Sequence, residues 1–130
     1  MILLDTHVAV WLLLEPDKLS SAATGAIRQS GLVASTPAIS CISFYEIAWA
    51  LHRGRIQSLL SPEAFLRRLL TFVRAIPFNE SIAVAAAQLP SNFPSDPMDR
   101  IIAATALSEG IPLVTADQRI RRSRAVKTIW

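Results

Sequence analysis

Short apolar runs alternate along the chain with longer stretches in which apolar residues recur at helical spacing. The short runs predict buried strands, and the longer stretches predict helices with one face in a core. Strands that alternate with helices indicate an α/β domain with a mainly parallel sheet. The expected strands are residues 2–4, 37–40, 75–78, 111–115 and 125–129, and the expected helices are residues 7–14, 22–29, 44–52, 62–73, 81–89 and 98–109.

The composition changes this picture little. Hydrophobic residues make up 52% of the 130 positions and charged residues 18%, which favours a filled core and excludes a disordered chain. No repeat or linker is visible, so residues 1–130 are expected to form one domain. The single cysteine, Cys41, excludes an intrachain disulfide. The apolar N-terminus is interrupted by Asp5 and His7, and no apolar run is long enough to span a membrane, so a soluble cytoplasmic protein is expected.

Basic residues outnumber acidic ones by 13 to 10, and they are clustered. Such clusters suit a polyanion such as RNA, although a solvated face or a contact for an acidic protein would give the same pattern. One group lies at the C-terminus and one in the middle of the chain: Arg119, Arg121, Arg122, Arg124 and Lys127, and Arg53, Arg55, Arg67 and Arg68.

Acidic residues stand at the ends of strands and the starts of helices. Asp5 and Asp117 follow predicted strands, whereas Glu46 and Asp99 fall in the first turns of predicted helices. Ligands of open α/β sheets bind outside the carboxyl ends of the strands. We therefore expect these acids to converge at one edge of the sheet.

Each acid except Asp5 also has a purely structural interpretation. Ser43 and Glu46 match a capping box, in which Glu46 would only bond back to the helix start. Asp96 fits a helix N-cap before Pro97, with Asp99 as a first-turn acid, and Asp117 could cap a short helical turn. Asp5 follows a fully apolar strand and has no comparably simple explanation.

A cluster of these acids would need a counter-charge. Two carboxylates about 5 Å apart repel by roughly 3 kcal/mol at an effective dielectric constant near 20, which is a large share of a stability of about 5–15 kcal/mol. Protons or divalent cations can neutralise such a cluster. Ligation by oxygen alone selects Mg²⁺ or Mn²⁺ over Zn²⁺, and these ions can activate water for attack on a phosphodiester.

Four segments in order resemble the motifs of PIN-domain toxins, the VapC-type partners in toxin–antitoxin pairs. The segments are LLDTHVAVWLL at 3–13, SFYEIAWAL at 43–51, DPMDRIIAATAL at 96–107 and PLVTADQRI at 112–120. The resemblance implies an α/β/α sandwich around a parallel sheet of four or five strands. It also implies a metal-dependent endoribonuclease, a homodimer, and inhibition by an antitoxin that inserts a segment into the active-site groove.

Carried onto this sequence, the resemblance gives catalytic and metal-holding roles to Asp5, Glu46, Asp99 and Asp117. Thr6, Asp96 and Thr115 become supporting residues, with Asp96 competing with Asp99 for the third position. Pro94 and Ser95 stand where the family often has a His-Arg pair, so any substrate contact by that pair is absent. The basic residues expected to contact RNA are Arg100, Arg119, Arg121 and Arg122.

Several alternatives stay open on the sequence alone. A phosphatase could use Asp5 as its nucleophile, but such enzymes usually carry a second Asp two positions later, where this chain has His7. A non-catalytic RNA- or protein-binding module could retain a vestigial acid cluster. The aromatic residues Trp11, Tyr45 and Trp49, together with Phe44, could stack on bases, although core or dimer packing is expected for most of them.

Overall fold

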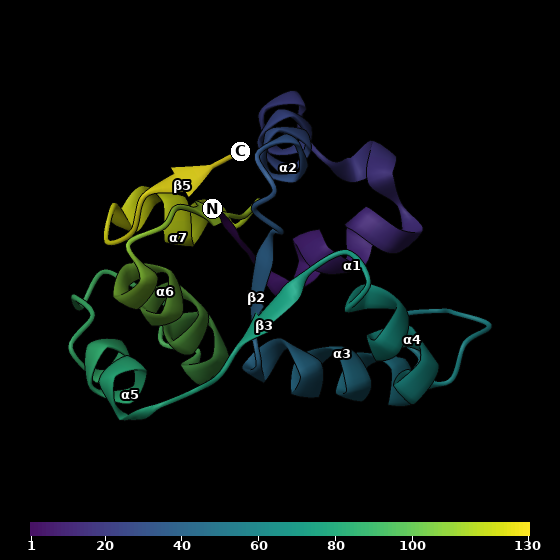
Figure 1. Ribbon diagram of the computed structural model, residues 1–130. Helices are drawn as coiled ribbons and strands as arrows, with labels where there is room; N and C mark the ends of the chain where they lie inside the picture. The colour runs from purple at the N-terminus through teal and green to yellow at the C-terminus, as the bar shows by residue number, and fades with distance from the viewer.

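A five-stranded, all-parallel sheet organises the computed structural model, which describes residues 1–130 (Figure 1). The strand order is β3-β2-β1-β4-β5, so the N-terminal strand lies in the middle. Leu3 of β1 pairs with Ala38 of β2 on one side and with Leu113 of β4 on the other. The strands are β1 (Leu3–Leu4), β2 (Ala38–Ser40), β3 (Arg74–Ile76), β4 (Leu113–Val114) and β5 (Thr128–Ile129).

Helices cover both faces of the sheet, which confirms the expected three-layer α/β/α sandwich. They are α1 (Thr6–Leu14), α2 (Ser21–Leu32), α3 (Ile42–His52), α4 (Pro62–Leu69), α5 (Glu80–Ala87), α6 (Pro97–Glu109) and α7 (Gln118–Ser123), with a 3₁₀ turn at Pro16–Lys18.

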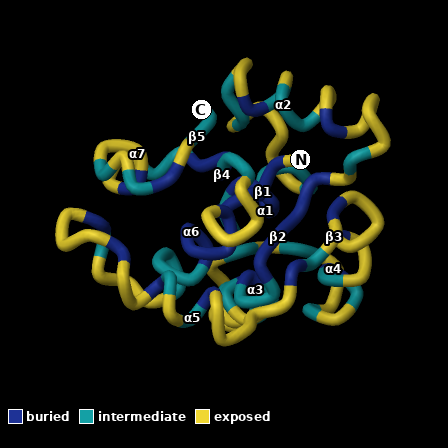
Figure 2. Tube along the Cα trace, turned by 60° about the vertical axis from the view of Figure 1, so that its left-hand side comes forward, coloured by how far each residue is buried: buried dark blue, intermediate teal, exposed yellow.

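Neighbouring strand residues point into opposite cores because side chains alternate along a strand. Leu4 packs with Val8, Ile47 and Phe65 beneath α1, α3 and α4. Leu3, one position earlier, packs on the other side with Ile102 of α6, in a cluster that also contains Ile120 of α7. Figure 2 shows the central strands as a buried stripe surrounded by exposed loops.

The direction in which strands are added reverses at β1. The chain places β2 and then β3 on one side of β1, but β4 and then β5 on the other. At such a reversal the connecting helices leave toward opposite faces, and a crevice opens at the carboxyl ends of the strands. Asp5 directly follows β1, and Thr115 directly follows β4, so both lie beside this crevice.

Several boundaries differ from those predicted. The helix expected over residues 62–73 ends at Leu69. In the turn that follows, the Thr71 hydroxyl donates to the Arg68 carbonyl, and the Val73 amide still donates to the Leu69 carbonyl. Helix α3 begins at Ile42, so Ser43 lies inside it. Helix α2 continues through Gly31, which keeps an ordinary negative φ, whereas Gly110 ends α6 at φ 65° as expected. None of the helices is long and apolar enough to cross a membrane.

Candidate active site

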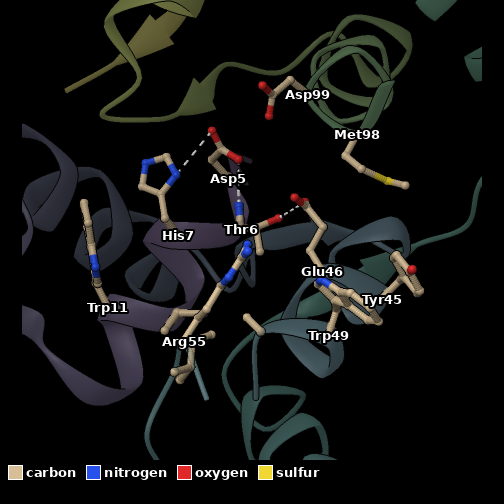
Figure 3. A pocket seen from close by; sticks show the side chains of 13 residues that line it. Asp5, Thr6, His7, Trp11, Tyr45, Glu46, Trp49, Arg55, Met98 and Asp99 are labelled. Atoms are coloured by element: carbon tan, nitrogen blue, oxygen red, sulfur yellow. Dashed lines mark hydrogen bonds and ion pairs between the residues drawn. The ribbon is translucent and has the colours of Figure 1, made fainter. Parts of the chain in front are cut away.

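Three carboxylates line one cavity of about 440 Å³ beside the crevice (Figure 3). They come from three elements that are distant in sequence: Asp5 from the end of β1, Glu46 from α3 and Asp99 from the first turn of α6. The structure therefore brings together three of the four acids that the sequence pointed to. Asp117 and Asp96 do not line this cavity.

The carboxylate of Asp5 is held from two sides. The Thr6 amide donates to Oδ1 at 2.8 Å, and the Thr115 hydroxyl donates to Oδ2 at 2.7 Å. Asp5 is only 4% exposed, and its carboxylate also serves as the N-cap of α1. Both oxygens are thus fixed in direction, one by the helix start and one by the strand beside it.

His7 ties the same carboxylate to the loop after β4. Its Nε2 accepts a hydrogen bond from the Ala116 amide at 3.1 Å, so the ring proton lies on Nδ1. That nitrogen faces Asp5 Oδ2 at 3.7 Å. The dashed line in Figure 3 marks this approach, and it places His7 beside the acids as a support rather than among them.

Glu46 is positioned by a relay of hydroxyl groups. The Thr6 hydroxyl donates to Glu46 Oε1 at 2.7 Å, and because its single proton is used there, the Ser43 hydroxyl donates to Thr6 Oγ1 at 2.9 Å. The capping-box interpretation of Ser43 and Glu46 is therefore wrong. Helix α3 has Cys41 as its N-cap without any side-chain cap, and Ser43 is buried one turn before Glu46.

Asp99 takes its place from the start of α6. Asp96 is the N-cap, with its Oδ1 accepting from the amides of Met98 and Asp99 at 2.8 and 3.3 Å, and Pro97 opens the helix. This matches the cap predicted for Asp96. The carboxylate of Asp99, about 20% exposed, then lies on the cavity wall, while that of Asp96 is used by the helix.

Asp117 is engaged elsewhere. It caps α7 through the amides of Arg119 and Ile120, and its Oδ2 lies 3.2 Å from Nη2 of Arg119. The same guanidinium nitrogen is 3.9 Å from Asp99 Oδ2, so Arg119 bridges the fourth acid to the third. Asp117 therefore does not line the cavity, but Arg119 joins its carboxylate to that of Asp99.

The acids of the cavity repel one another. Burial and the charges of Asp5, Asp96, Glu46 and Asp117 raise the pKa of Asp99 to about 7. Burial also raises the pKa of Glu46; the Thr6 hydrogen bond opposes this rise, and the charges on Asp5 and Asp96 add to it. For Asp117, burial acts to raise the pKa, but the hydrogen bonds from Arg119 and Ile120 outweigh it, and the pKa is lowered. The cavity is therefore short of positive charge.

A hard divalent cation fits this oxygen-only donor set. No three acidic, histidine or cysteine side chains are arranged as a ready coordination shell. Mg²⁺ keeps several of its waters and is often bound by only one or two carboxylates. Asp5, Glu46 and Asp99 are thus the residues that would hold such an ion, some of them through water. The raised pKa values of Glu46 and Asp99 are what crowded negative charge at such a site produces.

Arg100 does not line the cavity, and the RNA contact expected of it stays a prediction. Its guanidinium donates to the carbonyls of Ala86, Leu89 and Pro94 at 3.0–3.3 Å. These bonds fasten the end of α5 and the following loop to α6. Consecutive residues of a helix point in different directions, so Arg100 leaves α6 on another side than Asp99.

The other predicted basic residues lie on α7. The guanidinium of Arg119 pairs with the carboxylates of Asp99 and Asp117. Arg121 and Arg122 are exposed and line, with Gln118 and Arg124, a separate open cavity of about 370 Å³. They remain available to a polyanion near the carboxylates.

Sequence reasoning missed two groups of residues here. Ser43 was interpreted as a cap, although its hydroxyl reaches Glu46 through Thr6. His7 was assigned no role at the site, although its Nδ1 faces Asp5. Arg55, counted only within a basic group, lines the cavity itself, and Figure 3 shows its guanidinium pointing toward Thr6. No local signal marks Arg55, because a turn after α3 brings it back to the site.

Comparisons with known proteins agree with this fold. Residues 2–125 match the PIN domain. Ribonuclease VapC22 of Mycobacterium tuberculosis is 42% identical over 131 residues, covering 99% of this chain and 98% of the relative. The solved structure of VapBC2 from Rickettsia felis, bound to a promoter DNA fragment, aligns with a TM-score of 0.74 at 19% identity, over 98% of this chain and 97% of that chain. FitAcB from Neisseria gonorrhoeae aligns with a TM-score of 0.66 at 23% identity, over 98% and 96% of the chains.

Proposed function

This chain belongs to the PIN-domain family, and from that premise we propose that it is a Mg²⁺- or Mn²⁺-dependent endoribonuclease. Residues 1–130 would act as one catalytic domain. The observation that carries the proposal is the meeting of Asp5, Glu46 and Asp99 in a single cavity beside the switch point of the sheet. The 42% identical relative, a ribonuclease by name, supports RNA as the substrate.

The three carboxylates have distinct tasks in this scheme. When bound, the divalent ion supplies positive charge to the phosphate and lowers the pKa of a coordinated water. Asp5 presents fixed oxygens because Thr6 and Thr115 clamp both sides of its carboxylate. Glu46 and Asp99, whose pKa values are raised without a metal, would be ionised once the ion is bound and would complete its oxygen ligands. Arg121 and Arg122 neutralise flanking phosphates.

An antitoxin partner and a homodimer belong to the same proposal. The solved structures with this fold include several toxin–antitoxin complexes, which supports a protein inhibitor for this chain. An inhibitor that covered the cavity would hide the carboxylates from RNA.

Measuring RNA cleavage with and without metal tests the proposed enzymatic activity. Purified protein is expected to cut RNA internally with Mg²⁺ or Mn²⁺ and to stop when the metal is chelated. Asp5→Asn should bind RNA at least as well and cut it far more slowly. Asp17→Asn, an identical change at an exposed position outside the cavity, serves as the matched control. Binding without any metal-dependent cleavage would favour a non-catalytic RNA-binding module.

A further inference from the structure

The cavity that holds the three carboxylates continues past them along the exposed side of α3. This second part is lined by Tyr45, Trp49 and Arg55. We propose that it is a base-stacking subsite, which takes an unpaired nucleotide of the RNA next to the cleaved phosphate. The proposal rests on the ribonuclease function proposed above, because one strand must reach both the subsite and the acids.

Tyr45 and Trp49 form an aromatic surface one helical turn long. The two residues are four positions apart on α3, so their rings leave the helix on the same side. Their centroids are 6.3 Å apart and their planes are inclined by only 18°. Tyr45 is 57% exposed and Trp49 45% exposed, so neither is a core residue. Exposed, nearly parallel rings of this kind suit stacking on nucleobases, which all present a π-face.

Glu46 lies between the two aromatic residues in sequence and links the subsite to the chemistry. Its carboxylate turns inward to Thr6, while Tyr45 and Trp49 of the same helix line the adjoining wall. Figure 3 shows the rings beside Glu46, within the cavity that also contains Asp5 and Asp99. A nucleotide stacked here therefore has its neighbouring phosphate close to the carboxylates.

Arg55 supplies a cation on the same wall. It is the only arginine or lysine that lines the cavity, and its side chain takes part in none of the protein's ion pairs. The chain turns at Gly54, which has a φ of 72°, and the Arg55 amide bonds back to the Ala50 carbonyl at 2.9 Å. This turn directs the guanidinium into the cavity, where it can bind a phosphate through two parallel hydrogen bonds.

A protein segment with apolar and acidic side chains is the main rival occupant. RNA is favoured because the subsite is continuous with the carboxylates and because its free guanidinium matches the repeated phosphates of a strand. Arg53, whose guanidinium lies 5.3 Å from the centroid of Trp49, adds further positive charge beside the rings. A strand of unpaired nucleotides supplies both the flat surfaces and the anions that these residues can bind.

The test measures RNA binding in an Asp5→Asn background, in which RNA stays intact. Fluorescence anisotropy gives the dissociation constant of a short, unstructured, fluorescein-labelled oligouridylate. Trp49→Leu is expected to weaken binding by about 5- to 150-fold, and Trp49→Phe to recover most of the loss. Arg55→Gln should weaken binding and lower the salt dependence by about one phosphate contact. Arg67→Gln on α4, an identical charge change at an exposed site outside the cavity, should have little effect.

The outcomes distinguish a failure of the subsite proposal from a failure of the enzyme proposal. If wild-type protein cleaves RNA but Trp49→Leu and Arg55→Gln bind the oligouridylate as tightly as the background, the subsite is overturned and the enzyme stands. Equal losses on a blunt-ended, fully paired RNA duplex would also overturn it, because paired bases cannot stack on the rings. If wild-type protein cuts no RNA, the enzyme proposal fails and the subsite beside a cleaved phosphate falls with it, even where the binding series shows that the rings bind unpaired RNA. Tyr45→Leu repeats the test should Trp49→Leu lower the Tm.

Discussion

The hydroxyl of Thr115 donates a 2.7 Å hydrogen bond to the carboxylate of Asp5, and it also accepts from the amide of Asp117 at 3.1 Å. Both Asp5 and Thr115 are buried. The bond joins the ends of two neighbouring parallel strands, 110 positions apart in sequence. The Thr115 hydroxyl therefore fixes both the direction of the Asp5 carboxylate and the backbone that leads to Asp117.

Removing that hydroxyl should weaken both the fold and the chemistry. Thr115→Val keeps the shape but leaves a buried carboxylate oxygen and the Asp117 amide without their partner, at an expected cost of about 1–3 kcal/mol in the free energy of unfolding. Misaligned Asp5 should lower the rate of RNA cleavage by about 10- to 100-fold. Chemical denaturation and single-turnover cleavage measure the two effects. Thr128→Val on β5, whose hydroxyl makes no hydrogen bond with a side chain, is the control.

A second prediction concerns the hydrogen bonds that run from Ser43 through Thr6 to Glu46. Thr6→Val should slow cleavage by about tenfold and weaken the apparent affinity for Mn²⁺, because Glu46 loses its donor. Thr6→Ser restores a hydroxyl at the same place and should recover most of the activity. Since the Thr6 amide still donates to Asp5, the helix start is kept in both variants. Full activity of Thr6→Val at limiting Mn²⁺ would count against the relay.

The raised pKa of Asp99 predicts how stability depends on pH without metal. Its folded-state pKa of about 7 lies above the ordinary value of 3.8, so the folded protein holds a proton that the unfolded chain releases. The free energy of unfolding should therefore fall as pH rises from about 4 to 7. We expect a loss of about 1–2 kcal/mol from this group, less than the ~4 kcal/mol of a full three-unit shift, because solvent reaches the carboxylate.

Urea denaturation at pH 5 and pH 8 measures that loss. Asp99→Asn should reduce the difference between the two pH values. Mg²⁺ should stabilise the wild-type protein more at pH 8 than at pH 5, because it binds the ionised carboxylates. A wild-type protein whose metal-free stability is the same at both pH values would contradict the charge crowding described for the cavity.

Arg100 should be needed for the fold and dispensable for RNA. Arg100→Met removes three bonds from a half-buried guanidinium to backbone carbonyls, which should lower the free energy of unfolding by about 2–4 kcal/mol. RNA affinity per folded molecule should stay unchanged. Arg121→Met on exposed α7 should show the reverse, with weaker RNA binding and an unchanged Tm. A large loss of RNA affinity in Arg100→Met would restore the role predicted from the sequence.

Sequence patterns predicted the layers and the place where the acids meet. Apolar runs that alternate with helical periods indicated a parallel sheet, and the carboxyl ends of parallel strands share one edge. The N-cap at Asp96 and the helix end at Gly110 could be predicted because each depends only on residues close to it in sequence. Local rules succeed where the contact itself is local.

The contacts that the sequence did not predict are long-range ones. The bond from Thr115 to Asp5, the pairing of Ser43 with Thr6 and the return of Arg55 to the cavity all depend on tertiary packing. Ser43 was misassigned because the Ser-x-x-Glu spacing of a capping box also fits one turn inside a helix. The bonds of Arg100 to backbone carbonyls were also not predicted, because neighbours in a helix differ in direction by about a quarter of a turn.

The central position of β1 makes the order of synthesis matter. The first strand to leave the ribosome can complete its pairing only when β4, at Leu113–Val114, has also been made. Until then Asp5 lacks the Thr115 hydroxyl, and the Ala116 amide that holds His7 does not yet exist. A nascent or prematurely terminated chain therefore carries Asp5, Glu46 and Asp99 without the Thr115 hydrogen bond that aligns Asp5. Only completed protein molecules should cleave RNA.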